Sequence, residues 1–252
     1  MNLIERLNNF VIESKKQNTR ISKNFYCSAL SNCSRRLFYD KLGTAKDPSN
    51  ITGLSIRRMD VGSAIHSLYQ DYLVKAGLVA SQDDIEVSIK DLEYRISGRM
   101  DGILTDPVLL EKCVLEIKSV GTVDNANSLP YDSHLDQIQV YMHLTKIHKG
   151  KLLYIFLDKR EKPINYKGNY PYVSDCDILE IDVTYDPEYV KKIYVKIKNI
   201  IDSLDKKTPP HALYGSQSDC KWCEFVSTCK KGDNVTNTYD LSSIFGVSYG
   251  KN

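Results

Sequence analysis

The sequence contains no run of about 18 consecutive apolar residues, so no segment predicts a membrane-spanning helix. Its beginning also lacks the charged and then apolar layout of a secretory signal peptide, which predicts a protein that stays in the cytoplasm. No charge of one sign dominates, because the net charge is +2 at pH 7 with 26% charged and 42% hydrophobic residues. These values exclude a disordered chain and a uniformly basic nucleic-acid-binding protein.

No internal repeat is visible, and 252 residues are enough to bury a full core, so a single domain is the simplest expectation. The basic residues concentrate in residues 1–60, where eleven Lys and Arg accompany five Asp and Glu. This local surplus exceeds the net charge of the whole chain, so the remainder is net acidic. A basic segment and an acidic remainder are typical of a phosphate-binding surface beside a carboxylate metal site, although a solvated helical surface would have a similar charge distribution.

Apolar residues recur at helical spacing in five segments, which predicts helices at residues 2–16, 30–42, 60–76, 133–149 and 187–204. Runs typical of β-structure predict strands at residues 85–89, 94–104, 112–120, 152–157 and 178–183. The last of these is predicted to be an edge strand, and Gly150 is predicted to end the helix before the fourth strand. The pattern therefore indicates a sheet with helices before and after it.

Two carboxylates and a lysine occur on neighbouring predicted strands. Asp101 stands at the end of one strand, and Glu116 and Lys118 lie two residues apart on the next. Residues two apart on a strand share a face, so both side chains can reach one site while Ile117 packs behind. Burying Glu and Lys costs on the order of several kcal/mol unless each has a partner. A metal ion held by Asp101 and Glu116 would supply one.

The chemistry of these residues fits phosphodiester hydrolysis. Carboxylate oxygens suit Mg²⁺ or Mn²⁺, which binds a scissile phosphate and lowers the pKa of a coordinated water. Lys118 would orient or deprotonate that water and stabilise the charge gathering on the phosphate. The competing interpretation is an ordinary Glu–Lys pair on a surface strand. The pattern Gly98-x-x-Asp101 on the preceding strand favours the metal site.

Two helices offer further polar residues at one-turn spacing. His66 lies four residues after Gly62, so both share a face, and a neutral His66 would complete the ligand set of the metal. Gln137 and Tyr141 are also four apart and would hydrogen-bond a phosphate or Lys118 from one face. Considered alone, these positions indicate ordinary packed or solvated helix residues.

Taken in order, Gly62-x-x-x-His66, Gly98-x-x-Asp101, Glu116-x-Lys118 and Gln137-x-x-x-Tyr141 resemble the motif series of RecB-like nucleases in the PD-(D/E)XK superfamily. The resemblance covers residues 30–230 and implies an α/β fold: a restriction-endonuclease-like core with a central mixed sheet flanked by helices. It implies that Mg²⁺ or Mn²⁺ is held by His66, Asp101, Glu116 and the carbonyl of Ile117. It implies a catalytic set of Asp101, Glu116, Lys118, Gln137 and Tyr141.

Seven cysteines are present, and three crowd into the segment from Cys220 to Cys229. In a chain without a secretion signal, such crowding favours metal ligation over disulfides. Asn32-Cys33-Ser34-Arg-Arg with Cys220-x-x-Cys223-x5-Cys229 resembles the iron–sulfur arrangement of the CRISPR-associated Cas nucleases numbered four and of AddB-type nucleases. Ser34 stands where those families often have Pro. The resemblance implies a [4Fe-4S] cluster on Cys33, Cys220, Cys223 and Cys229.

This cluster would tie together a helical lobe built from residues 20–59 and 206–232, beside a core at 60–205 and a polar tail at 233–252. Cys27 is an alternative first ligand, but the Arg-Arg-aromatic run follows Cys33. Zn²⁺ on the same four cysteines remains an alternative to iron and sulfur. Cys113 and Cys176 are predicted to be buried apolar residues rather than ligands.

We therefore expect a metal-dependent DNA exonuclease, with its preference for single strands or frayed ends implied by the resemblance alone. Its phosphate contacts are predicted at Arg35, Arg36, Arg57 and Arg58. DNA is the expected partner, with other DNA-processing or CRISPR proteins as further partners and a bacterial or phage-infected cell as the setting. Two alternatives stay open: a structure-specific endonuclease, and a non-catalytic iron–sulfur or zinc module that only binds DNA.

Overall fold

The computed structural model describes residues 2–16, 22–47, 52–158, 162–210, 220 and 223–231. Its α-helices are α1 (Leu3–Lys16), α2 (Ser34–Leu42), α3 (Gly53–Lys75), α4 (Asp132–Thr145), α5 (Pro187–Asp205) and α7 (Val226–Lys231). Its strands are β1 (Phe25–Tyr26), β2 (Ile85–Asp91), β3 (Ile96–Thr105), β4 (Lys112–Val120), β5 (Lys149–Phe156), β6 (Tyr172–Ser174) and β7 (Ile178–Thr184). Within the described residues, no helix has the length and apolar character needed to cross a membrane.

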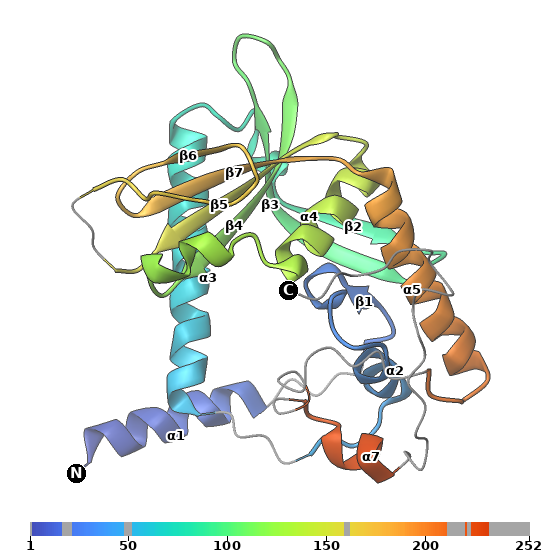
Figure 1. Ribbon diagram of the computed structural model, residues 1–252. Helices are drawn as coiled ribbons and strands as arrows, with labels where there is room; N and C mark the ends of the chain where they lie inside the picture. The colour runs from blue at the N-terminus through green and yellow to red at the C-terminus, as the bar shows by residue number, and fades with distance from the viewer. Residues whose placement is uncertain are drawn as a thin grey trace.

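The strands form one mixed sheet in the order β1-β3-β4-β5-β7-β6, with β2 also paired to β3 (Figure 1). β1 is parallel to β3 and β4 is parallel to β5, while the other pairs are antiparallel. Helix α3 covers one face, where Ile65 and Leu73 pack against Leu115 and Ile117. Helices α4 and α5 cover the other face and enclose the larger apolar core. The architecture is the predicted central mixed sheet flanked by helices.

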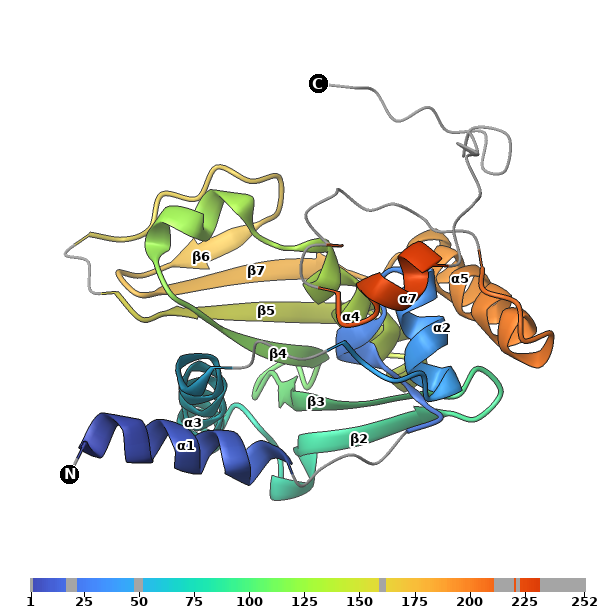
Figure 2. The ribbon, with the colours of Figure 1, turned by 90° about the horizontal axis from the view of Figure 1, so that it is seen from below.

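Segments from the two ends of the chain lie side by side at α2 and α7 (Figures 1 and 2). The rings of Tyr39 and Phe225 pack with their centroids 5.9 Å apart. Arg36 forms an ion pair of 2.9 Å with Glu224, whose carbonyl accepts a 2.7 Å hydrogen bond from the backbone N–H of Asp47. Because α2 also packs against α5, the C-terminal segment is joined to the body of the protein.

The predicted helix at residues 133–149 is wrong at its C-terminal end. α4 ends at Thr145, Lys146 follows with a φ of 60°, and β5 begins at Lys149. Gly150, predicted to end the helix, lies inside β5, where an added Cβ would come within 2.9 Å of Ile138. This segment is a strand because β4 and β7 pair with it on its two sides, a tertiary effect that local propensity does not reveal.

Other features also differ from the predictions. Helix α3 begins at Gly53 rather than at residue 60, because Thr52 and Ser55 form a capping box ahead of it. β7 is not an edge strand, since β6 pairs with its outer side. Asp101 lies inside β3 rather than at its end.

Candidate active site

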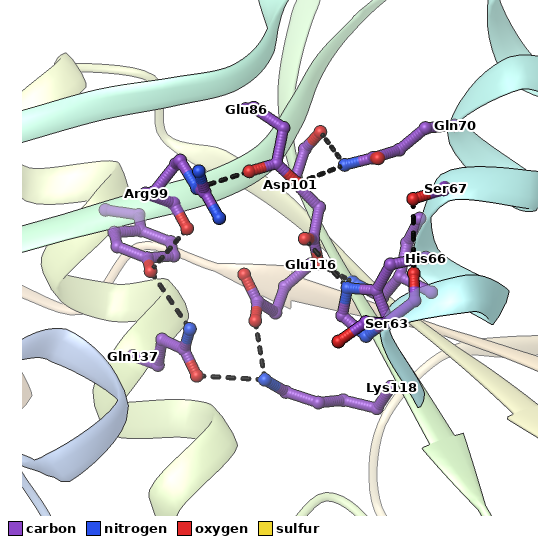
Figure 3. Close-up of polar contacts among 12 residues, drawn as sticks. Ser63, His66, Ser67, Gln70, Glu86, Arg99, Asp101, Glu116, Lys118 and Gln137 are labelled. Carbon is purple, nitrogen blue, oxygen red and sulfur yellow. Dashed lines mark hydrogen bonds and ion pairs between the residues drawn. The ribbon is translucent and has the colours of Figure 1, made fainter. Parts of the chain in front are cut away.

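Asp101 lies where β3 and β4 stop pairing with each other. Their ladder ends with Gly102 opposite Leu115. One residue further on, Oδ2 of Asp101 accepts a 2.6 Å hydrogen bond from the backbone N–H of Ile117, so the carboxylate takes the place of a strand partner. The Asp101 side chain is only 8% exposed. The two strands therefore diverge at this residue, and the polar side chains of Figure 3 gather around the divergence.

Glu116 and Lys118 lie on β4 at the same place. Nζ of Lys118 donates to Oε1 of Glu116 at 2.5 Å and to Oε1 of Gln137 at 2.9 Å. The Glu116 side chain is 3% exposed, and its second oxygen, Oε2, is buried without a hydrogen-bond partner. Burial raises the pKa of Glu116 to about 7, although the charge of Lys118 opposes this rise. One carboxylate oxygen is thus paired, and the other is an unsatisfied acceptor inside the protein.

Helix α4 connects Lys118 to the backbone of β3. Nε2 of Gln137 donates to the hydroxyl of Tyr141 at 2.9 Å, and that hydroxyl donates to the carbonyl of Arg99 at 3.0 Å. A Cβ at Gly98 would lie 2.6 Å from the Tyr141 ring and 2.7 Å from Sγ of Cys27, so only glycine fits there. The residues of the predicted Gln137 and Tyr141 motif therefore form a continuous hydrogen-bonded chain with Lys118.

His66 approaches Asp101 from helix α3 on the other face of the sheet. Its Nδ1 lies 2.9 Å from Oδ1 of Asp101. Burial by itself would lower the pKa of His66, but the hydrogen bond and charge of Asp101 together raise it above its ordinary value. A Cβ at Gly62 would stand 3.2 Å from Oγ of Ser119, so glycine lets α3 pass close to β4. His66 and Gly62 share the helix face that their spacing predicts.

The donor atoms at this site fit a hard divalent cation. The buried, unpartnered Oε2 of Glu116 is costly unless something binds it, and carboxylate oxygens are preferred ligands of Mg²⁺ and Mn²⁺. Both oxygens of Asp101 accept hydrogen bonds, from His66 and from Ile117. In the part of the chain that the structure describes, no three His, Cys, Asp or Glu side chains are arranged as a metal cluster. Binding a cation through Asp101 would therefore replace hydrogen bonds that these side chains now make.

Four residues that the sequence motifs do not contain also belong to the site. Gln70 donates to the carbonyl of Asp101 at 3.0 Å and to Oε1 of Glu86 at 2.9 Å, while Arg99 forms an ion pair with the other Glu86 oxygen. Gln70 lies one helical turn after His66, so the sequence spacing could have predicted that the two share a helix face. The sequence could not have predicted the place of Glu86, since it joins the site only through the pairing of β2 with β3.

His134 is the fourth such residue and lies at the start of α4, one turn before Gln137. Its Nδ1 is 3.0 Å from the hydroxyl of Tyr154. Burial and the charge of Lys118 lower the pKa of His134 to about 4, so this imidazole is neutral at pH 7. It adds no positive charge beside Lys118.

The cysteines fall into separate groups. Cys33 immediately precedes α2, and burial is the largest cause that raises the pKa of Cys223. The backbone N–H of Cys223 donates to the carbonyl of Cys220, and Arg35 reaches Sγ of Cys229 at 3.6 Å. Cys27 instead packs beside Gly98 at the candidate active site. Cys229 therefore lies against α2, which Cys33 precedes, whereas Cys27 lies at the candidate active site.

The other two cysteines are only partly buried. Cys113 lies on β4 and Cys176 in the turn between β6 and β7, and neither is buried as predicted.

The four arginines predicted to bind phosphate are placed in two regions. Arg35 donates to the carbonyl of Pro210 at 2.8 Å, and Arg36 pairs with Glu224, so both join α2 to the C-terminal segment. Arg57 donates to Asn8 of α1 at 2.5 Å, and Arg58 is exposed on α3. The structure therefore gives three of the four a role in joining segments of the chain.

The mixed sheet, its flanking helices and the polar site between diverging strands are consistent with a restriction-endonuclease-like fold. Solved structures agree: SSO0001 superposes with a TM-score of 0.55 at 20% identity, over 91% of this chain and 96% of that chain. LHK-Exo, an alkaline exonuclease from Laribacter hongkongensis solved with dAMP, gives a TM-score of 0.52 at 15% identity, over 74% and 90%. No family model and no curated protein matches the sequence. At such low identity the similarity establishes a shared fold.

Proposed function

We propose that this protein is a metal-dependent deoxyribonuclease of the PD-(D/E)XK class, acting as an exonuclease on single strands or frayed ends. The observation that carries the proposal is the meeting of Asp101, Glu116 and Lys118 where β3 and β4 diverge, with one oxygen of Glu116 buried and unpartnered. An isolated surface Glu–Lys pair would not be 3% exposed on its acidic side. The likeness in fold to LHK-Exo, an exonuclease solved with dAMP, supports this assignment.

The roles of the residues follow from their contacts. Asp101 and Glu116 would hold Mg²⁺ or Mn²⁺, with His66 and the carbonyl of Ile117 completing the set. The cation, when bound, supplies Lewis-acid polarisation of the phosphate and a more acidic water. Lys118 would orient the attacking water through Nζ and offset the charge that develops on the phosphate. Gln137 holds that ammonium group in place, and Tyr141 holds Gln137.

The decisive experiment incubates end-labelled single-stranded DNA with the full chain and Mn²⁺. We expect Lys118→Ala and Glu116→Gln to lose about 100- to 1000-fold in cleavage rate, the usual cost of removing a transition-state charge partner. Lys112→Ala, an exposed lysine at the start of the same strand, is the matched control and should retain full activity. Wild-type protein that binds the DNA but leaves it intact would instead identify a non-catalytic DNA-binding module. Products cut from within a circular single strand would identify an endonuclease.

We also propose that Cys33, Cys220, Cys223 and Cys229 hold a [4Fe-4S] cluster, as the cysteine spacing favours. Arg35 contacts Sγ of Cys229 and Arg36 pairs with Glu224, so the segment after Cys33 meets the segment that carries the late cysteines. Anaerobically purified protein should absorb in the visible range and contain about four irons, following from the cluster type. Cys33→Ser should lose the colour, and Cys176→Ser, a cysteine of the β6–β7 turn, should keep it. A colourless protein that contains zinc would show that the four cysteines bind zinc rather than an iron–sulfur cluster.

A further inference from the structure

A cavity of about 580 Å³ opens beside His66 and Asp101 on the α3 side of the site. This volume lies within the range of pockets that hold small ligands, which is roughly 300 to 1,000 Å³. Helix α3 lines it with a face that carries small side chains at Gly62, Ser63 and Ser67. Because residues three and four apart share a helix face, this spacing keeps the cavity open along one side of α3.

Arg99 is the cation that faces this cavity from the sheet. It stands two residues before Asp101 on β3, so the two share a side of the strand and are separated by about 7 Å along it. Its side chain is 68% exposed, and its carbonyl is held by Tyr141, which fixes the backbone from which the guanidinium extends. An exposed arginine one strand step from a site for the scissile phosphate is positioned to bind the neighbouring phosphate of the same strand.

Glu86 is the ion-pair partner of Arg99. It forms an ion pair with Arg99, while Gln70 donates to its other oxygen. Glu86 adopts a φ of 53° inside β2, a conformation that a non-glycine residue rarely takes without reason, and it lines the cavity. Exposed ion pairs contribute only about 0 to 1 kcal/mol, so a phosphate can displace Glu86 from Arg99. Gln70, 6% exposed, would continue to hold Glu86 after that exchange.

We propose that the cavity is a second phosphate subsite of the nuclease, in which Arg99 binds the backbone phosphate next to the scissile one. Glu86 holds the guanidinium in place until DNA arrives. The inference rests on the proposed nuclease function and adds to it a residue that sets the affinity for the substrate strand. Substitutions of Glu86 and of Arg99 should therefore change DNA binding in opposite directions, because Glu86 competes with the phosphate that Arg99 binds.

The test measures binding of a fluorescent single-stranded oligonucleotide by anisotropy, with every variant built on Lys118→Ala so that the DNA stays uncut. We expect Arg99→Gln to weaken binding about tenfold and to reduce the salt slope by about 0.7, the value for one lost contact to a single strand. Arg99→Lys should weaken it about threefold, since a point charge replaces a bidentate fork. Glu86→Gln should tighten binding about threefold. Lys90→Gln, an exposed lysine on the same hairpin, should change it less than twofold.

In the protein that retains Lys118, Arg99→Gln and Arg99→Lys should raise KM and Glu86→Gln should lower it, each leaving kcat within about threefold, as expected for uniform binding. Thermal melting identifies variants that fail to fold. If Arg99→Gln fails to fold, Arg99→Lys still tests the subsite. Equal effects of Arg99→Gln and Lys90→Gln, or weaker binding by Glu86→Gln, would overturn the subsite. If wild type cleaves DNA while both arginine variants bind normally, the subsite fails and the nuclease stands. Wild type that neither binds nor cuts DNA overturns both.

Discussion

The α4 side and the α3 side of the candidate site differ in how tightly their polar side chains are held. On the α4 side, Lys118, Gln137 and Tyr141 form one hydrogen-bonded chain that ends on the backbone of β3, and Gln137 and Tyr141 are buried. On the α3 side, Arg99 and Ser67 are exposed beside a cavity of about 580 Å³. The difference indicates that α4 fixes the geometry of the charged groups, whereas α3 leaves room for a ligand.

The largest expected effect on folding stability comes from closing the little space left on the α4 side. Gly98→Ala would place a Cβ 2.6 Å from the Tyr141 ring and 2.7 Å from Cys27, and the ring cannot move without losing its hydrogen bonds. We expect the free energy of unfolding to fall by about 2 to 3 kcal/mol, as in overpacked cores. Urea denaturation measures this. Gly121→Ala, where an added Cβ meets nothing within 4 Å, is the control and should be nearly neutral.

Tyr141→Phe is expected to lower the free energy of unfolding by less than Gly98→Ala does, but also to lower the rate of DNA cleavage. The phenol accepts a buried hydrogen bond from Gln137 and donates a partly buried one to the carbonyl of Arg99, so losing both should cost about 1 to 2 kcal/mol in total. Because Gln137 holds Lys118, kcat should also fall about tenfold, the scale of a misplaced catalytic group. Tyr172→Phe, an exposed tyrosine on β6, should change neither quantity. An unaltered kcat for Tyr141→Phe would mean that the chain does not position Lys118.

The buried His134 predicts a dependence of stability on pH. Burial and the charge of Lys118 lower its pKa from 6.5 to about 4 in the folded protein, whereas the unfolded chain takes up a proton near pH 6.5. The folded state is therefore favoured above pH 6.5, and this advantage is lost as the pH falls toward 4.

Between pH 7 and pH 4.5, the free energy of unfolding of wild type should fall by about 1 to 2 kcal/mol relative to His134→Gln. Urea denaturation at a series of pH values provides the comparison. His148→Gln, at an exposed histidine before β5, should follow wild type. Parallel curves for wild type and His134→Gln would show that the start of α4 is more open than its contacts indicate.

The smallest effect is expected on the α3 side. Ser67 is exposed, and its hydroxyl donates only to the carbonyl of Ser63 in the preceding helical turn. Ser67→Ala should change the free energy of unfolding by less than about 0.5 kcal/mol, as is usual for surface substitutions. A loss above 1 kcal/mol in urea denaturation would contradict the open character of this side.

The features that the sequence predicted are those that depend on spacing within one helix or strand. Glu116 with Lys118, and Gln137 with Tyr141, are each close pairs on one element, so strand and helix periodicity indicated their shared faces. The helix predicted through residue 149 and the supposed edge strand at 178–183 were wrong because both β5 and β7 are defined by partners on two sides. Gln70 was overlooked although its spacing from His66 was informative. Glu86 had no such signal.

The sequence by itself determined the order of the motifs, the chemical types of the groups and the elements that carry them, since these depend on local spacing along the chain. Only the tertiary structure decided that β3 and β4 diverge at Asp101, that Oε2 of Glu116 is buried without a partner, and that Arg99 faces a cavity while paired with Glu86. These features arise from packing between segments far apart in sequence. Local periodicity carries no information about the distances between such segments.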